Sequence, residues 1–228
     1  MNVNIIEQAF ACAGRGRLHS SQIPGQERFV AVSLAVGVRA IIVTAGVGCS
    51  LFGRVSSDSL IRLHANCSFL RLNAPRIELG LAADDGIATL SEASNAGSGT
   101  PRRFLHDGDY EVKAGQVVTS DIVIRGNLRI RAGARICGSV KSTQDLLLED
   151  GVSVEGSLIS ARKMRVGPRC AIHGPVVAER ELTIATGTRC GTLEHPTTVS
   201  APRIEIEEGV ISFGTVWARE YGHVGAGE

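Results

Sequence analysis

The middle of the chain is written in blocks of 18 residues: LRIRAGARICGSVKSTQD (128–145), LLLEDGVSVEGSLISARK (146–163) and MRVGPRCAIHGPVVAERE (164–181). The same residue type returns to the same place in each block, and a fixed period of this size is typical of a solenoid of stacked turns. Four columns recur at this step: Leu128, Leu146, Met164 and Leu182; Ile130, Leu148, Val166 and Ile184; Val118, Ile136, Val154, Ile172 and Cys190; Gly138, Gly156 and Gly174.

Within each block, apolar and polar residues alternate, as in Leu128-Arg129-Ile130 and Leu182-Thr183-Ile184. This alternation predicts short strands with one face inward and one outward. Glycine before a new strand lets the chain turn a corner that a Cβ atom would obstruct. We therefore expect an all-β protein, a parallel β-helix solenoid with about 18 residues per turn.

A looser form of the repeat precedes the regular one. Residues 74–79 (APRIEL) nearly duplicate residues 201–206 (APRIEI), whereas residues 91–103 are rich in Ser, Gly and Ala without an apolar period. A polar insertion at 194–198 is expected to leave one corner of the rod. The predicted organisation is an N-terminal cap or tail (1–29), a short degenerate β-helix block (30–81), a linker or long loop (82–108), the regular β-helix (109–221) and a tail (222–228).

Composition narrows the function. The chain has 228 residues and a net charge of +1, which gives no electrostatic reason to expect a nucleic-acid partner. No signal peptide or uninterrupted membrane-length apolar run is visible, so we expect a cytoplasmic protein. The six cysteines are Cys12, Cys49, Cys67, Cys137, Cys170 and Cys190. No pair of them has the spacing of metal ligands. We therefore interpret them as apolar core residues in a reducing compartment.

Residues 107–224 resemble the bactofilins, polymer-forming cytoskeletal proteins of bacteria. The resemblance rests on a recurrent unit, and it is supported by Gly214 to Ala218 in the last turn. It implies a right-handed β-helix that assembles end to end into nucleotide-free filaments, which often lie on the inner membrane and act as a scaffold for envelope machinery. The unit occurs as Ile136-Cys137-Gly138-Ser139-Val140, Val154-Glu155-Gly156-Ser157-Leu158 and Ile172-His173-Gly174-Pro175-Val176.

This resemblance predicts a structural protein with no catalytic, cofactor or metal site. Its partner would be a second copy, with cell-envelope proteins or the inner face of the cell membrane as further candidates. We expect Phe213, Val216 and Trp217 to form a self-association contact at the C-terminal turn, or else a plain hydrophobic cap. Bactofilins usually hold one β-helix between disordered tails, so the additional N-terminal block could instead occupy one end of the rod.

Two other functions stay open. One is a binding module that recruits a partner along its flanks without polymerising. The other is a hexapeptide-type acyltransferase, because apolar residues also recur at steps of six, and His195 on the inserted loop would then be the general base.

A charge hypothesis concerns the two ends of the regular rod. Opposite charges gathered at the first and last turns would favour head-to-tail contacts between copies. The basic residues are Arg125, Arg129, Arg131 and Arg135, and the acidic ones are Glu205, Glu207, Glu208 and Glu220.

Overall fold

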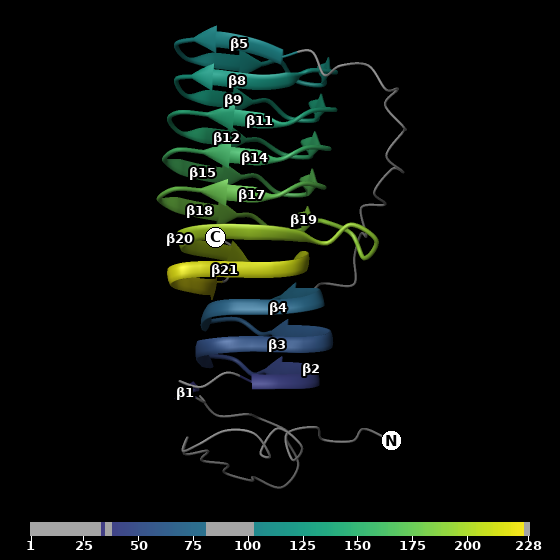
Figure 1. Cartoon of the computed structure of the whole chain (residues 1–228), viewed down its shortest axis with the longest axis vertical. Coiled ribbons are helices and arrows are strands. Elements are labelled where there is room, and N and C mark those ends of the chain that lie inside the picture. Colours follow the sequence, from purple (N-terminus) through teal and green to yellow (C-terminus); the bar gives the residue numbers. More distant parts are fainter. Residues whose placement is uncertain (1–32, 35–37, 81–102, 226–228) are drawn as a thin grey trace, which may run out of the picture.

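The computed structural model describes residues 33–34, 38–80 and 103–225, and every regular element in these ranges is a β-strand. The strands coil into a long rod (Figure 1) of about nine turns with about 18 residues in each turn. The predicted all-β solenoid is confirmed. The predicted cap or tail at 1–29 and most of the predicted linker lie outside the described residues.

The regular part stacks turns of three short strands. The pairing is parallel, and its register joins Leu128 to Leu146, Leu146 to Met164 and Met164 to Leu182, which confirms the predicted columns. The strands are β5 (Arg103–Asp107), β6 (Tyr110–Val112) and β7 (Val117–Val118); β8 (Asp121–Arg125), β9 (Leu128–Ile130) and β10 (Arg135–Ile136); β11 (Val140–Ser142), β12 (Leu146–Leu148) and β13 (Ser153–Val154); β14 (Leu158–Ser160), β15 (Lys163–Val166) and β16 (Ala171–Ile172); β17 (Val176–Ala178), β18 (Glu181–Ile184) and β19 (Arg189–Cys190).

Two longer strands, β20 (Thr197–Glu207) and β21 (Val210–Gly225), complete this part. The loop between β19 and β20 leaves the rod at one corner (Figure 1), as the insertion predicted. Leu193 in this loop is 60% exposed.

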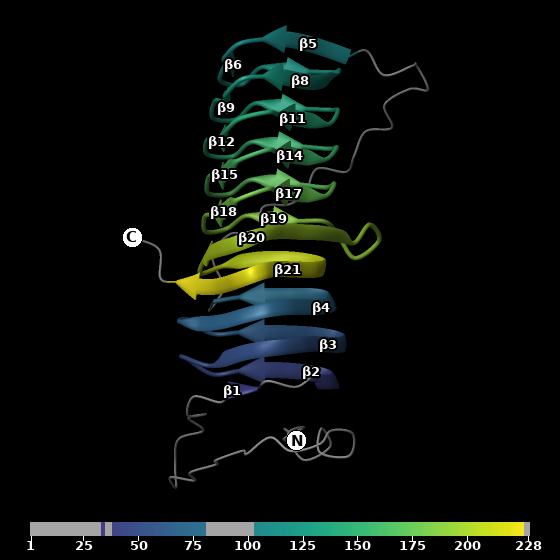
Figure 2. The same ribbon diagram turned by 60° about the vertical axis from the view of Figure 1, so that its left-hand side comes forward.

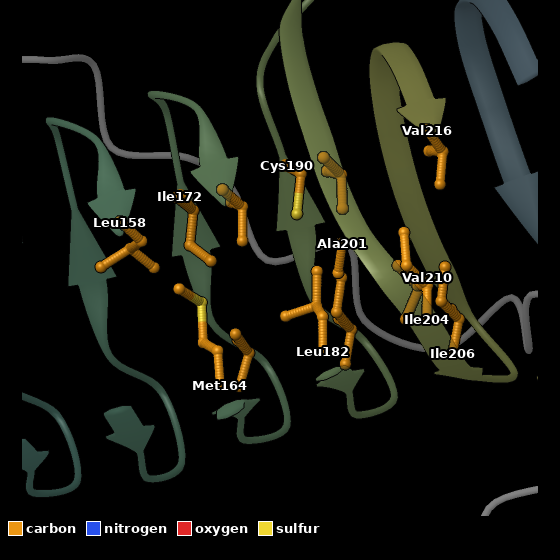
Figure 3. Close-up of a cluster of buried hydrophobic side chains, with 14 of the residues drawn as sticks. Leu158, Met164, Ile172, Leu182, Cys190, Ala201, Ile204, Ile206, Val210 and Val216 are labelled. Atoms are coloured by element: carbon orange, nitrogen blue, oxygen red, sulfur yellow. The ribbon is translucent and has the colours of Figure 1, made fainter. Parts of the chain in front are cut away.

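One continuous core fills the rod. Figure 3 shows inward side chains of successive turns stacked on one another, among them Met164, Leu182 and Ile204, each at most 2% exposed. A buried side chain of this size contributes roughly 1.5–3 kcal/mol to stability. Because one turn cannot cover its own apolar face, the stack supplies the stability.

The glycine column marks a corner where successive turns touch. A Cβ on Gly156 would lie 2.6 Å from the carbonyl carbon of Gly138, and one on Gly174 would lie 2.5 Å from that of Gly156. No side chain fits at this distance, which confirms the predicted reason for these glycines.

The N-terminal block is a second piece of the same solenoid. Its strands are β1 (Ser33–Leu34), β2 (Val38–Ala45), β3 (Ser50–Leu63) and β4 (Cys67–Leu79), paired in parallel. Ala74, Ile77 and Leu79 are buried, as are the residues that they duplicate, Ala201, Ile204 and Ile206. The near-duplicated sequences therefore present the same face to the core.

The two blocks join into a single rod (Figures 1 and 2) through an antiparallel pairing of β4 with β21. The register runs from Val210 opposite Leu79 to Val224 opposite Cys67. The last turn of the regular β-helix is thus covered by the chain's own N-terminal block, which is the second of the two arrangements that the sequence left open.

Two predicted boundaries also move. Strand β5 lies inside the predicted linker (82–108), because Phe104 and His106 occupy the inward columns of Ile122 and Ile124. Strand β21 extends into the predicted tail (222–228), because Val224 is buried in the column of Ile206.

Candidate functional site

The three residues predicted to bind a second copy lie at the joint between the two blocks. Val216 is fully buried opposite Leu72 of β4. Trp217 is 40% exposed, and the Arg71 guanidinium lies 5.0 Å from the centre of its ring. Phe213 is half-buried where the register shifts between Ser212 and Gly214. Their described contacts at this edge are therefore within one chain.

This joint is closely packed. A Cβ on Gly222 would lie 2.5 Å from the Phe69 ring, so the two elements meet without space between them. The Asn73 side-chain amide donates to Thr215 Oγ1 at 2.7 Å, and the Ser68 and Tyr221 hydroxyls lie 3.2 Å apart. We interpret the joint as a structural interface.

One end of the rod is the first regular turn, formed by β5, β6 and β7 (Figure 1). Within the described part of the chain, β5 pairs only with β8, β6 only with β9 and β7 only with β10. The outer edge of this turn therefore presents unpaired backbone groups, the kind of edge to which another strand can add.

The backbone direction of β5 follows from the next turn. The Ile122 N–H donates to the Ser139 carbonyl at 2.8 Å, and the Ile124 carbonyl accepts from Thr143 at 3.0 Å, so both residues face away from β5. In a strand, alternate residues direct their backbone groups to opposite sides. Phe104 and His106 lie in the columns of Ile122 and Ile124, so their backbone groups likewise face the following turn, β8. The N–H and C=O groups of Arg103, Leu105 and Asp107 therefore face the open edge.

Three aromatic rings cover the core at this end. Phe104, His106 and Tyr110 occupy the inward columns, and the Phe104 and His106 ring centres lie 5.0 and 5.1 Å from that of Tyr110. Phe104 remains 37% exposed, although the residue in its column one turn on, Ile122, is buried. Around this end, Leu105 and Val117 are 53% and 61% exposed. This end of the rod therefore exposes apolar side chains, and no other described strand caps it.

Sequence reasoning missed this face because aromatic residues and a histidine replace the aliphatic residues that define the repeat. A signal was nevertheless present. Phe104 and Tyr110 lie 18 residues before Ile122 and Leu128, so extending the columns backward by one step finds the turn.

The hypothesis of opposite charges at the two ends of the regular rod is wrong. Its acidic residues lie on β20 and β21 or between them, next to the joint and not at an open end. The basic residues are balanced locally: Arg125 pairs with Asp107 at 3.3 Å, Arg129 with Glu149 at 2.5 Å, Arg131 with Glu111 at 3.8 Å and Arg135 with Glu155 at 2.7 Å. The hydrogen bond from Arg129 lowers the pKa of Glu149.

His195, the candidate general base, lies in the exposed loop before β20. The loop is held by its backbone, with the His195 N–H donating to Thr192 Oγ1 and the Thr192 N–H donating to the His195 carbonyl, both at 3.0 Å. Neither bond involves the imidazole, so these contacts do not hold the ring in a fixed orientation.

The cysteines of the described segments are mostly core residues. Burial raises the pKa of Cys170 to about 11 and that of Cys190 to about 12, which leaves both thiols protonated and unreactive at neutral pH. Across these segments no group of three or more His, Cys, Asp or Glu side chains could hold a metal ion.

A shallow groove of about 700 Å³ runs along one flank, over β6, β9, β12, β15 and β18. Its lining mixes Asp145, Lys163 and Glu181 with apolar side chains. Several of its polar side chains already accept hydrogen bonds from the backbone of the next turn. Asp109 accepts from the Asn127 N–H, the Asn127 side chain from the Asp145 N–H, and Asp145 from the Lys163 N–H.

The described residues define a β-solenoid with an internal joint and an unpaired strand edge at β5 to β7. No protein-family model matches the chain, and neither the curated proteins nor the solved structures contain a significant match. No segment of the described ranges forms a helix that could serve as a transmembrane span.

Proposed function

We propose that this chain is a bactofilin-like structural protein of the cytoplasm. It associates with further copies of itself through the terminal turns of its β-solenoid, without nucleotide, and so serves as a cytoskeletal or scaffold element. The bactofilin part of this proposal comes from the resemblance of residues 107–224.

A single observation carries the self-association. The first turn combines an unpaired strand edge with three exposed apolar side chains, Phe104, Leu105 and Val117. An edge of this kind is normally blocked by charges, bulges or a covering segment. Here the middle residue of the edge strand is Leu105, and none of the described segments covers this edge.

The N-terminal block changes where such a contact can form. Because β4 occupies the edge of β21, the C-terminal turn is not available to a second copy while the joint is intact. The self-association contact predicted at Phe213, Val216 and Trp217 is therefore proposed to lie at β5 to β7.

Sedimentation velocity and negative-stain electron microscopy of the full chain test this function. We expect the wild-type sedimentation coefficient to rise with concentration. The double variant Leu105→Lys/Val117→Lys should stay monomeric, because both side chains are exposed on the end turn and their loss leaves the core intact. Leu193→Lys, on the loop at the flank and 60% exposed, is the matched control and should behave as the wild type.

A wild-type chain that remains monomeric at high concentration would contradict the proposal. That result would favour the non-polymerising binding module, for which the flank groove is the candidate surface. Association that is equally lost in Leu193→Lys would place the contact on the flank instead of the end.

A further inference from the structure

We propose that one corner of the rod, at the joint between the two blocks, binds an acidic peptide segment of another protein. This joint corner consists of Phe52, Arg54, Arg71, Trp217 and Tyr221. The joint lies along the side of the rod (Figure 1), away from the β5 end. Binding at this corner therefore goes beyond the proposed self-association and does not depend on it.

Strands from both blocks form the joint corner. Strand β4 pairs with β3 on one side and with β21 on the other, and the register shifts on both sides at the same place. Where β4 has only Leu70, β3 has residues 52–53 and β21 has residues 218–221, so both neighbours bulge there. Phe52 lies in one bulge and Tyr221 in the other, and they are 45% and 43% exposed. Neither block carries this corner alone.

A column of outward side chains crosses the joint beside the bulges. Arg54 lies opposite Arg71 in the parallel pairing, and Arg71 lies opposite Trp217 in the antiparallel one. The residues that follow the two arginines in the chain, Val55 and Leu72, are buried, so the arginines stand on the outer face. The contact of 5.0 Å between the Arg71 guanidinium and the centre of the Trp217 ring places the indole in the same column.

No acid balances the two arginines of this column. Other arginines near the joint pair with carboxylates: Arg62 and Arg76 with Glu78, and Arg203 with Glu220. Among the described residues, Arg54 and Arg71 have no ion-pair partner, and the Arg71 Nε atom is buried without an acceptor. Like charges that face each other on paired strands destabilise a sheet. An anionic group bound over the column would relieve this repulsion.

The chemistry of the corner fits a peptide that combines acids with apolar side chains. Arginine binds a carboxylate through two parallel hydrogen bonds. Trp217, Phe52 and Tyr221 supply exposed aromatic area next to the arginines. Tryptophan, tyrosine and arginine are also the residues that contribute most to the affinity of protein interfaces.

Two other ligand classes fit less well. Small molecules bind in concave sites, whereas this surface is a corner of the rod. A single nucleic-acid strand follows a run of positive charge over several nucleotides. Here only two arginines are unbalanced, the carboxylate of Glu220 lies in the same bulge as Tyr221, and the whole chain has a net charge of +1.

A peptide titration of the full chain tests the proposal. The chain has one tryptophan, Trp217, so its fluorescence reports directly on the corner. The probe is a fluorescein-labelled peptide of alternating Asp and Leu residues. We expect it to change the emission of Trp217 and to gain anisotropy, with an affinity that falls as salt is added. Peptides of alternating Ser and Leu, or of Lys and Leu, should not bind.

Exchange of the two arginines tests their role. Arg54→Gln/Arg71→Gln should weaken binding of the Asp–Leu peptide by about tenfold or more, because it removes both partners of the carboxylates. Arg165→Gln is the matched control, since Arg165 on β15 is exposed and has no ion-pair partner among the described residues. It should bind the peptide as the wild type does.

The aromatic contribution needs a separate variant. Phe52→Ser should weaken binding severalfold and leave its salt dependence unchanged, because it removes apolar area and no charge. Thermal unfolding of each variant, followed by circular dichroism, checks that the fold is kept. The end-turn variant Leu105→Lys/Val117→Lys should bind the peptide as tightly as the wild type, which separates this site from the self-association.

Several results would overturn the proposal. They are no binding of the Asp–Leu peptide up to its solubility limit, equal binding of the Ser–Leu peptide, and unchanged affinity in Arg54→Gln/Arg71→Gln. Tighter binding of single-stranded oligo(dT) would make the corner a nucleic-acid site. Dissociation of wild-type assemblies by the peptide would make its occupant a second copy. Binding that requires both the acids of the peptide and the two arginines supports the proposal, whether or not the wild type self-associates.

Discussion

Gly156 has no room for a side chain, because a methyl group would lie 2.6 Å from the backbone of Gly138 in the preceding turn. Gly156→Ala should force the two turns apart and lower the free energy of unfolding by about 1–3 kcal/mol. Urea denaturation followed by circular dichroism measures this change.

A second glycine gives the control for that measurement. Gly133 has a φ of +69°, and a Cβ added to it would have no atom within 4 Å. Asparagine tolerates this left-handed conformation, so Gly133→Asn should change stability by less than about 0.5 kcal/mol. Equal losses in the two variants would show that crowding at the corner is not the reason for Gly156.

The same left-handed position recurs at each turn, and it is not always glycine. Gly133, Gly151 and Gly187 have φ values of +69°, +64° and +70°, whereas Arg169 has φ +52° in the same column. The Arg169 side chain pairs with Asp150 of the preceding turn. One turn thus accepts a strained residue where its neighbours avoid the strain with glycine.

At the scale of the strands, a ladder of Asp and Asn side chains links one corner of the rod from turn to turn. Asp109 Oδ1 accepts from the Asn127 N–H at 2.7 Å, Asn127 Oδ1 from Asp145 at 3.1 Å and Asp145 Oδ1 from Lys163 at 3.1 Å. Each side chain satisfies a backbone donor of the next turn. The ladder therefore holds successive strands in register where the parallel pairing is interrupted.

The hydrogen bonds to Asp109 and Glu149 predict that the stability of the fold depends on pH. The Asn127 N–H and side chain lower the pKa of Asp109, and Arg129 lowers the pKa of Glu149. A carboxylate with a lowered pKa in the folded state stabilises the fold above its ordinary pKa, near 4, and this stability is lost as the pH falls through the lowered value.

Denaturation midpoints between pH 7 and pH 3 measure this effect. The double variant Asp109→Asn/Glu149→Gln should lose less stability than the wild type as the pH falls below about 4.5, because neither replaced group can be protonated there. Parallel curves for the two proteins would contradict a role for these carboxylates in acid stability.

The sequence predicts those strands whose residue types recur at the same position in the neighbouring turns. Leu128, Leu146 and Met164 recur at one step, and parallel stacking turns this recurrence directly into the register. The first turn does not show this recurrence, because Phe104 and His106 stand where the next turn has aliphatic residues. The joint escapes it for a different reason: β4 and β21 are far apart in the chain and antiparallel, so their pairing depends on two complementary edges and leaves no period in the sequence.

At the scale of the whole molecule, the joint decides whether the two blocks behave as one rod. Gly222→Val should push β21 away from Phe69, since even a Cβ would lie 2.5 Å from that ring. In a solenoid each turn depends mainly on its neighbours. We therefore expect β2 to β4 to lose amide hydrogen-exchange protection while β8 to β18 keep theirs.

Gly225→Val is the matched control, because the nearest atom to its Cβ would be 3.7 Å away. Its exchange pattern should match that of the wild type. Uniform loss of protection along the entire rod in Gly222→Val would show instead that the two blocks fold as one cooperative unit.

The antiparallel joint has a consequence for anything built from this molecule. The chain sense reverses where β4 meets β21, so the described rod begins a coil at β5 and begins another at β1 and β2 (Figure 2). Both tips are therefore starts of a coil, and neither is its finish. Two such rods that met tip to tip would therefore bring together strands of opposite sense, whichever tips they used.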